Sequence, residues 1–277
     1  METVEAFHTA ARRFCIEQFD EWVARYSSFP AGGPYSADAY RIFPRYRLAQ
    51  DTLINIERLA WSECASADQL KEKLLEAGSS AFESLADQLK NQSPALAALQ
   101  DQLSAYSTYI GKLDANMAFE VEPLPFRRVL SSEEVAALWL SPLAKWGIRG
   151  AGYGWFPLSD DPEPRGALTF HTDLWDSRQG AALFQNFLAH EALARCYMLR
   201  ELGPPDYELD RELATPAYDG SEKFIFKDDG WLIYASHESS LTLVGLVADF
   251  FRKNWSDADS LGYRGPYPTD DLRGTWG

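Results

Sequence analysis

Apolar residues recur three or four positions apart through most of the N-terminal part of the chain, which is the spacing of an amphipathic helix. This spacing predicts a helix of about six turns from Val4 to Tyr26. It predicts a second helix over residues 44–59, because Pro44 is suited to a first helical turn. A capping-box pattern at Ser66–Gln69 predicts the start of a third helix, in which Gly78 indicates a weak point or a kink.

The most regular spacing lies in a fourth helix, which is predicted to begin at Ser93 and Pro94. Its apolar residues follow alternating intervals of three and four: Leu96, Leu99, Leu103, Tyr106, Ile110, Leu113 and Met117. Such a seam is typical of knobs-into-holes packing between helices. With neighbouring helices of similar length, it favours an intramolecular antiparallel bundle over a dimeric coiled coil.

The pattern changes after residue 118, where short apolar runs replace the long helical period. Two prolines within residues 120–128 would interrupt both helix and sheet, so this segment is predicted to be a boundary or a crossing strand. Ser131 and Glu134 predict a capped helix that ends at Gly147. Further strands are predicted at Ala151–Leu158 and Ala167–His171, with a helix at Asp176–Glu191. Ala194–Leu199 is either the end of that helix or a strand, and its adjacent apolar residues favour the strand.

The densest structural signal is the stretch Glu222–Trp255. Two aromatic-rich runs, Phe224–Lys227 and Trp231–Ala235, flank residues 228–230, whose sequence Asp-Asp-Gly predicts an antiparallel hairpin with a positive φ at the turn. Leu241–Val244 predicts a third strand. The helical spacing that follows predicts a last helix that packs on the sheet.

These elements together predict an α+β protein with two domains. Residues 1–118 are expected to form the helical bundle, and residues 119–277 an antiparallel β-sheet flanked by helices, with an irregular tail from about residue 256. The chain contains 9 Trp, 13 Tyr and 16 Phe, which favours a well-packed globule over disorder.

The formal charge of the chain is −15, with −5 over residues 1–118 and −10 over residues 119–277. Such a surface repels phosphate backbones and anionic lipids, so we expect no binding to nucleic acid or membranes. It would instead attract a basic partner protein. The first residues lack the basic and apolar regions of a signal peptide, and no apolar run reaches about 18 residues. We therefore expect a cytoplasmic protein.

An acidic stretch precedes the central hairpin. Its carboxylates occupy every second position, so an extended chain would place them all on one side: Asp206, Glu208, Asp210 and Glu212. Like charges at this period repel one another unless they are solvated or matched by a cationic partner. We therefore predict a partner-binding surface, with Tyr207 as its aromatic anchor, at the following residues: Tyr207, Glu208, Asp210, Glu212 and Asp228.

Three of the 4 histidines lie in the second half, each with a carboxylate nearby: His171, His190 and His237. Neutral imidazoles with a carboxylate suit zinc or iron, provided that the fold brings them together. The sequence lacks the second histidine that a helical zinc-protease motif requires after His190. Walker A, CxxC and EF-hand patterns are also absent, and the 3 cysteines are scattered. We therefore expect no metal and no cofactor.

His237 and Glu238 form the strongest catalytic candidate, because they follow a predicted strand and are flanked by Ser236 and Ser239. Sites are commonly built where strands end beside loops. A Ser/His/Glu arrangement can carry out general acid–base chemistry when the groups are within hydrogen-bond reach. A histidine beside serines is more often a structural hydrogen-bonding group, and the chain has no GxSxG elbow, so a catalytic role is the alternative.

Two segments, Phe43–Leu59 and Pro216–Gly245, resemble recurring segments of uncharacterised bacterial proteins, some of them associated with toxin-immunity loci. Together the segments cover about a sixth of the chain. The resemblance implies a bacterial cytosolic setting and favours an immunity role. It assigns no activity and no functional residue.

The leading hypothesis from the sequence is a non-enzymatic acidic binding protein that neutralises a basic toxin by direct contact, because charge complementarity speeds such association. The first alternative is a small hydrolase or metal-dependent enzyme centred on His237 and Glu238. The second is a scaffold that oligomerises through the Leu96–Met117 seam. The sequence leaves the partner's identity and the oligomeric state open.

Overall fold

A computed structural model describes residues 3–28, 38–148, 155, 166–176, 179–256 and 258–259. The chain divides into two compact units, residues 1–124 and 125–277. The boundary expected after residue 118 falls inside a short helix, Ala115–Glu120. The strand predicted at 151–158 and the tail predicted after 256 lie almost wholly outside the described residues. Within the described part of the chain, every helix is too short or too polar to cross a bilayer.

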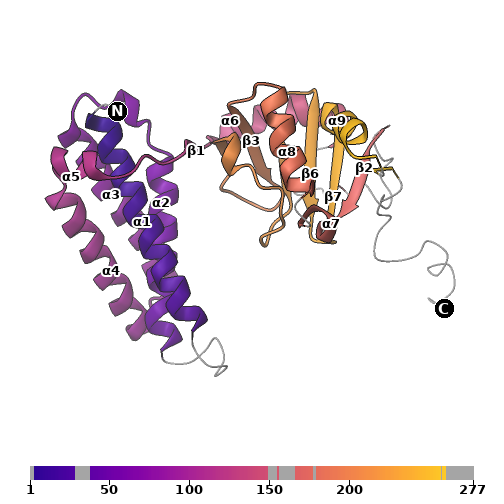
Figure 1. Ribbon diagram of the computed structural model, residues 1–277. Coiled ribbons are helices and arrows are strands. Elements are labelled where there is room, and N and C mark those ends of the chain that lie inside the picture. The colour runs from indigo at the N-terminus through magenta and orange to yellow at the C-terminus, as the bar shows by residue number, and fades with distance from the viewer. Residues whose placement is uncertain are drawn as a thin grey trace, which may run out of the picture. The chain divides into compact units, whose positions relative to one another are not determined.

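The first unit is helical, as the apolar spacing predicts, and its long helices lie side by side (Figure 1). Its helices are α1 Thr3–Ser27, α2 Ala39–Glu57, the 3-10 helix Trp61–Glu63, α3 Ala67–Gln88, α4 Ser93–Lys112 and α5 Ala115–Glu120. One prediction is corrected: α2 begins at Ala39, so Pro44 lies inside the helix and not in its first turn.

The apolar seam of α4 is buried within the helical unit. Leu99, Tyr106 and Ile110 are at most 3% exposed and belong to its hydrophobic clusters. The predicted seam is too long by one residue, because Asp114 caps α5 and Met117 is 38% exposed on that separate helix. The coiled-coil spacing is therefore used for packing inside this chain, as in an antiparallel bundle.

Gly78 allows close contact between α3 and α4. A Cβ at this position would lie 2.6 Å from Cε1 of Tyr106, which is closer than carbon atoms can approach. The Tyr106 hydroxyl donates a 2.8 Å hydrogen bond to the Leu74 carbonyl on the same helix as Gly78. α3 continues from Ala67 to Gln88, so Gly78 provides space for an aromatic ring and does not end the helix.

A polar cluster is buried between α1 and α2. Arg12 Nε donates to Glu57 Oε1 at 3.1 Å, and both side chains are at most 7% exposed. One turn earlier on α1, His8 Nε2 donates to the Ile56 carbonyl at 3.2 Å, while its ring stacks on Trp61. Burial, with a further contribution from Arg12, lowers the pKa of His8 from 6.5 to about 4. Near neutral pH His8 is therefore uncharged and Arg12 is the cation of the cluster.

We expect the helical unit to lose stability as pH falls from about 6.5 to 4. In that window the unfolded chain binds a proton at His8 that the folded chain does not, so the free energy of unfolding falls by roughly 3 kcal/mol in total. Below pH 4 this contribution is constant, because both states are protonated. The free energy of unfolding, measured with urea at several pH values from 4 to 7, should change less with pH for His8→Gln than for the natural chain. His190→Gln, at an exposed histidine, is the matched control.

The second unit contains a seven-stranded antiparallel sheet with the strand order β1-β4-β3-β5-β6-β7-β2. The strands are β1 Arg127–Val129, β2 Leu168–His171, β3 Arg195–Arg200, β4 Tyr207–Asp210, β5 Lys223–Phe226, β6 Trp231–Ser236 and β7 Ser240–Gly245. The predicted α+β fold, a helical bundle followed by an antiparallel sheet flanked by helices, is confirmed.

Helices cover both faces of the sheet. They are α6 Ser132–Leu138, the π-helix Trp139–Leu143, the 3-10 helix Ala144–Trp146, α7 Thr172–Asp176, α8 Gln179–His190 and α9 Leu246–Asn254. α8 and α9 pack on the face that bears Trp231, and α8 lies in front of the sheet in Figure 1. The segment after α6 packs Trp139 on Phe224 of the other face. Of the helix predicted at 176–191, α8 covers Gln179–His190; Asp176 belongs to α7, and residues 177–178 lie outside the described residues.

The β5–β6 turn differs from the prediction in its backbone. Gly230 does not have a positive φ. Instead, Asp228 Oδ1 accepts a 2.7 Å hydrogen bond from the Gly230 N–H, so an aspartate side chain shapes the turn. A glycine with a positive φ lies nearby in the structure: Gly245 ends β7 and has φ +70° and ψ −143°. The Gly230 carbonyl accepts a 3.0 Å hydrogen bond from Leu246 N at the start of α9.

Candidate functional site

A cleft of about 230 Å³ lies at one end of the sheet. Three segments of the second unit form it: α7, the β6–β7 turn and the loop Pro216–Tyr218. Its polar wall contains Ser236, His237 and Ser239, and Trp175 lies among its apolar lining residues. The cleft is therefore amphipathic, with its hydrogen-bonding groups on the turn.

The β6–β7 turn has the geometry of a three-residue hairpin loop, because Ser236 pairs with Ser240 across residues 237–239. Such loops place their last residue in the left-handed region, and Ser239 has φ +57°. Ser236 Oγ accepts a 3.1 Å hydrogen bond from the Glu238 N–H, which holds the turn closed. The loop thus presents His237 at the cleft from a fixed backbone.

His237 Nδ1 forms a short hydrogen bond with Oε1 of Glu222. The Glu222 side chain is 10% exposed, whereas that of His237 is 52% exposed. A carboxylate that accepts the Nδ1 proton selects one imidazole tautomer and leaves Nε2 as a proton acceptor. The arrangement thus provides an oriented imidazole on the wall of a cleft.

A second buried carboxylate, Glu201, lies beside Glu222. The Glu201 N–H donates to the Glu222 carbonyl at 3.1 Å, which places Glu201, just after β3, opposite Glu222, just before β5. Glu201 accepts hydrogen bonds from the Tyr234 hydroxyl at 2.8 Å and from Trp155 N at 3.1 Å. Burial raises the pKa of Glu201, and the Tyr234 hydrogen bond opposes part of that rise.

Besides the predicted pair of His237 and Glu238, the fold brings in Glu222, whose carboxylate forms the hydrogen bond to the imidazole. A signal for Glu222 was present in the sequence. In the β5–β6 hairpin Lys223 pairs with Ala235, so the preceding residue, Glu222, falls opposite Ser236. Counting the hairpin register backwards from the turn would have placed Glu222 next to His237.

The three histidines of the second half have different partners. His190 ends α8 and pairs with Glu191 at 2.9 Å. His171 Nδ1 on β2 accepts a 3.2 Å hydrogen bond from the Asp173 N–H. Among the described residues, no group of three or more His, Cys, Asp and Glu side chains could hold a metal ion. The metal-dependent alternative therefore has no site in this part of the chain.

The acidic stretch is not extended throughout. β4 ends at Asp210, and Arg211–Leu213 forms a 3-10 helix, so Glu212 leaves the predicted alternation. Asp206 is buried and accepts a 2.7 Å hydrogen bond from Arg200 N. The expectation of a row of carboxylates on one side is therefore wrong, because the strand is too short to hold it.

The predicted partner-binding residues also differ in exposure. Tyr207 is only 7% exposed. Glu208 pairs with Arg128 at 2.9 Å, and Asp210 pairs with Arg195 at 3.4 Å while accepting a hydrogen bond from Phe126 N. Glu212 and Asp228 are exposed. Glu208 and Asp210 therefore hold strand β1 and the residue before it, Phe126, against β4, which is a structural role.

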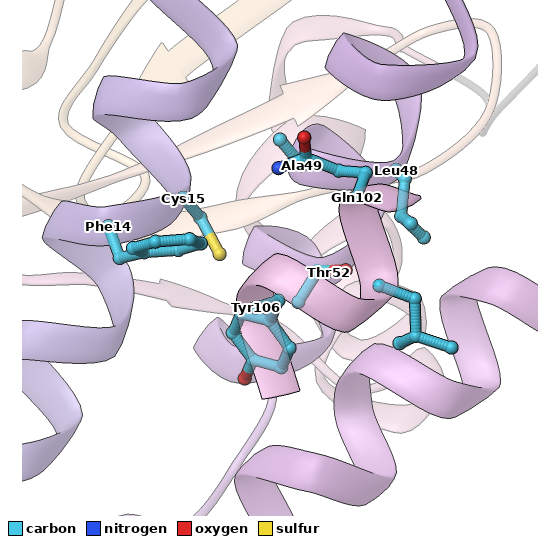
Figure 2. Close-up of a pocket in the computed structure, with 8 residues that line it drawn as sticks. Phe14, Cys15, Leu48, Ala49, Thr52, Gln102 and Tyr106 are labelled. Carbon is cyan, nitrogen blue, oxygen red and sulfur yellow. The ribbon is translucent and has the colours of Figure 1, made fainter. Parts of the chain in front are cut away.

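A second, much smaller cavity lies in the helical unit and has a volume of about 10 Å³ (Figure 2). Figure 2 shows Cys15, Thr52 and Tyr106 around it. This space holds about one water molecule and is too small for an organic ligand. Burial raises the pKa of the Cys15 thiol, which keeps it protonated and unreactive. The cleft at His237 is therefore the stronger candidate of these two cavities.

A scan against models of protein families, a search of curated proteins and a search of solved structures each find no match to the chain.

Proposed function

We propose that the second unit is a small hydrolase that acts on a small molecule in the cleft at His237. The observation that carries this proposal is the hydrogen bond between His237 Nδ1 and the buried carboxylate of Glu222. Burying a carboxylate costs free energy unless its charge is paired. A histidine with only a structural role at the surface does not require such a partner. The same pairing orients an imidazole for general-base catalysis.

In the proposed reaction His237 Nε2 removes a proton from a water molecule as the oxygen attacks a carbonyl carbon of the substrate. The imidazolium is stabilised by Glu222, which holds Nδ1–H. When the bond to the leaving group breaks, the proton passes from Nε2 to that group, and His237 returns to its neutral form. Ser239, which lines the cleft, is positioned to contact the substrate.

His237→Gln should reduce hydrolysis of p-nitrophenyl acetate and related small esters by about 100-fold, the usual contribution of a general base. Glu222→Gln should reduce it by about tenfold, because an amide orients the ring less well. His190→Gln is the control, since this exposed histidine lies at the end of α8. Far-UV circular dichroism establishes that each variant is folded. Equal rates for His237→Gln and His190→Gln would exclude the proposal.

The neutralisation of a basic toxin is our second proposal. It is supported by the charge of −15 and by the exposed carboxylates of Glu212 and Asp228. It is weakened by the burial of Tyr207 and by the ion pairs of Glu208 and Asp210. The resemblance to proteins of toxin-immunity loci favours this role, whereas the geometry of the cleft favours hydrolysis. We rank hydrolysis first because it uses groups that the fold has brought together.

A further inference from the structure

The cleft at His237 lacks charged groups of its own on the walls that the structure describes. The described residues that line it include no Lys, Arg, Asp or Glu, and its titratable groups are Tyr218 and His237. An anionic ligand would therefore lose its hydration without gaining a direct partner for its charge. Burial of an unpaired charge is costly, so this lining disfavours phosphates and carboxylates.

The groups around the cleft are mainly acidic. The carboxylates that adjoin its lining residues, or the partner of His237, are Asp173, Asp219, Glu238, Glu222 and Glu201. Among the described residues, the cations near these carboxylates are Lys223 and Arg200, which both pair with Asp219, at 2.6 Å and 3.7 Å. In the part of the chain that the structure describes, carboxylates thus outnumber cations around the cleft, and their field favours positive charge there.

The cleft also offers aromatic surface to a ligand. Tyr218 is 46% exposed, and its ring centroid lies 6.3 Å from that of His237. Trp175, on the apolar side, is only 4% exposed and stacks on Phe251 with ring centroids 5.7 Å apart, so Tyr218 is the main aromatic surface in the cleft. An exposed aromatic face attracts a cation, while the apolar wall accommodates hydrocarbon.

We propose that the cleft binds a small organic cation, an amine that carries an apolar group. The inference rests on the proposed function, because it names the substrate class of the same site. For hydrolysis the substrate would be an ester or amide of such an amine-bearing molecule. Phosphate esters and free carboxylates are excluded from the class.

Three probes of equal size separate charge from shape: benzylamine, benzyl alcohol and benzoate. Binding to the full chain at pH 7 is followed by NMR shifts of the His237 and Tyr218 ring signals. Benzylamine should bind at least about tenfold more tightly than benzoate, a difference that one partly exposed charge interaction supplies. Benzyl alcohol should fall between them. The advantage of benzylamine should shrink as salt is raised, because salt screens exposed charges.

Two variants test the parts of the site. Glu222→Gln should reduce the preference for benzylamine over benzyl alcohol. Tyr218→Leu should weaken the binding of benzylamine more than the binding of benzyl alcohol. Benzoate binding as tightly as benzylamine would overturn the inference, and so would the absence of shifts from every probe up to about 10 mM, where fragments of this size bind. Selective binding of benzylamine without esterase activity would support this inference and contradict the proposed hydrolysis, so the two failures are distinguishable.

Discussion

Replacing Gly245 with alanine should lower the free energy of unfolding of the sheet unit by about 3–4 kcal/mol. The backbone of Gly245, at φ +70° and ψ −143°, is in a region that residues with a Cβ rarely enter. A Cβ there would also lie 2.2 Å from the Gly230 carbonyl oxygen. That oxygen accepts the hydrogen bond from Leu246 N, so relief of the clash would disturb both the β5–β6 turn and the start of α9.

Gly147→Ala is the matched control for Gly245→Ala. Gly147 also has a positive φ, +80°, but a Cβ there would meet no atom within 4 Å. The Gly147→Ala variant should lose only the free energy that a left-handed backbone costs a residue with a Cβ, about 1 kcal/mol. Urea unfolding followed by tryptophan fluorescence measures both variants. Similar losses for the two would show that the close approach to Gly230 is unimportant.

Replacing Glu57 with alanine should destabilise the helical unit by about 3–5 kcal/mol, because it leaves the Arg12 charge buried without its carboxylate partner. The Arg12 and Glu57 side chains are 7% and 0% exposed, so water cannot replace the lost hydrogen bond without opening the α1–α2 contact. Urea unfolding followed by far-UV circular dichroism, which reports mainly on helix, provides the measurement.

Two further variants separate this buried pair from ordinary ion pairing. Asp87→Ala removes the partner of Lys90 in an exposed pair at 3.3 Å and should cost less than about 1 kcal/mol. The double variant Arg12→Met with Glu57→Met should recover much of the loss, since apolar residues of similar volume need no counter-charge. A double variant no more stable than Glu57→Ala would mean that the pair is not the source of the effect.

The helical unit shows how much local sequence can predict. Each long helix contains a stripe of apolar residues, and the spacing of that stripe depends on the helix alone. It located α1 and α4 closely, with α4 beginning at Ser93. Pro44 was misplaced because a proline is typical of first turns, whereas the buried face of α2 extends back to Ala39. There tertiary packing outweighed a local preference.

The candidate site was predictable only in part. The strand and turn signals around residues 231–245 placed His237 on a polar turn beside a strand end, and the structure places it there. The contact with Glu222 was missed because it depends on the register between β5 and β6, which sets Glu222 opposite Ser236, the residue before His237. Glu222 is 15 residues from His237 in sequence and within hydrogen-bond distance in the fold.

By itself, the sequence determined the α+β class, the positions of most helices and strands, and the acidic charge of the chain. The tertiary structure decided which carboxylates are held in ion pairs and which one orients His237. It placed Glu208 and Asp210 in ion pairs, buried Tyr207, and brought Glu222 to His237. The physical reason is that secondary structure follows local periodicity, whereas the environment of a charged group depends on strand order and register, which long-range pairing sets.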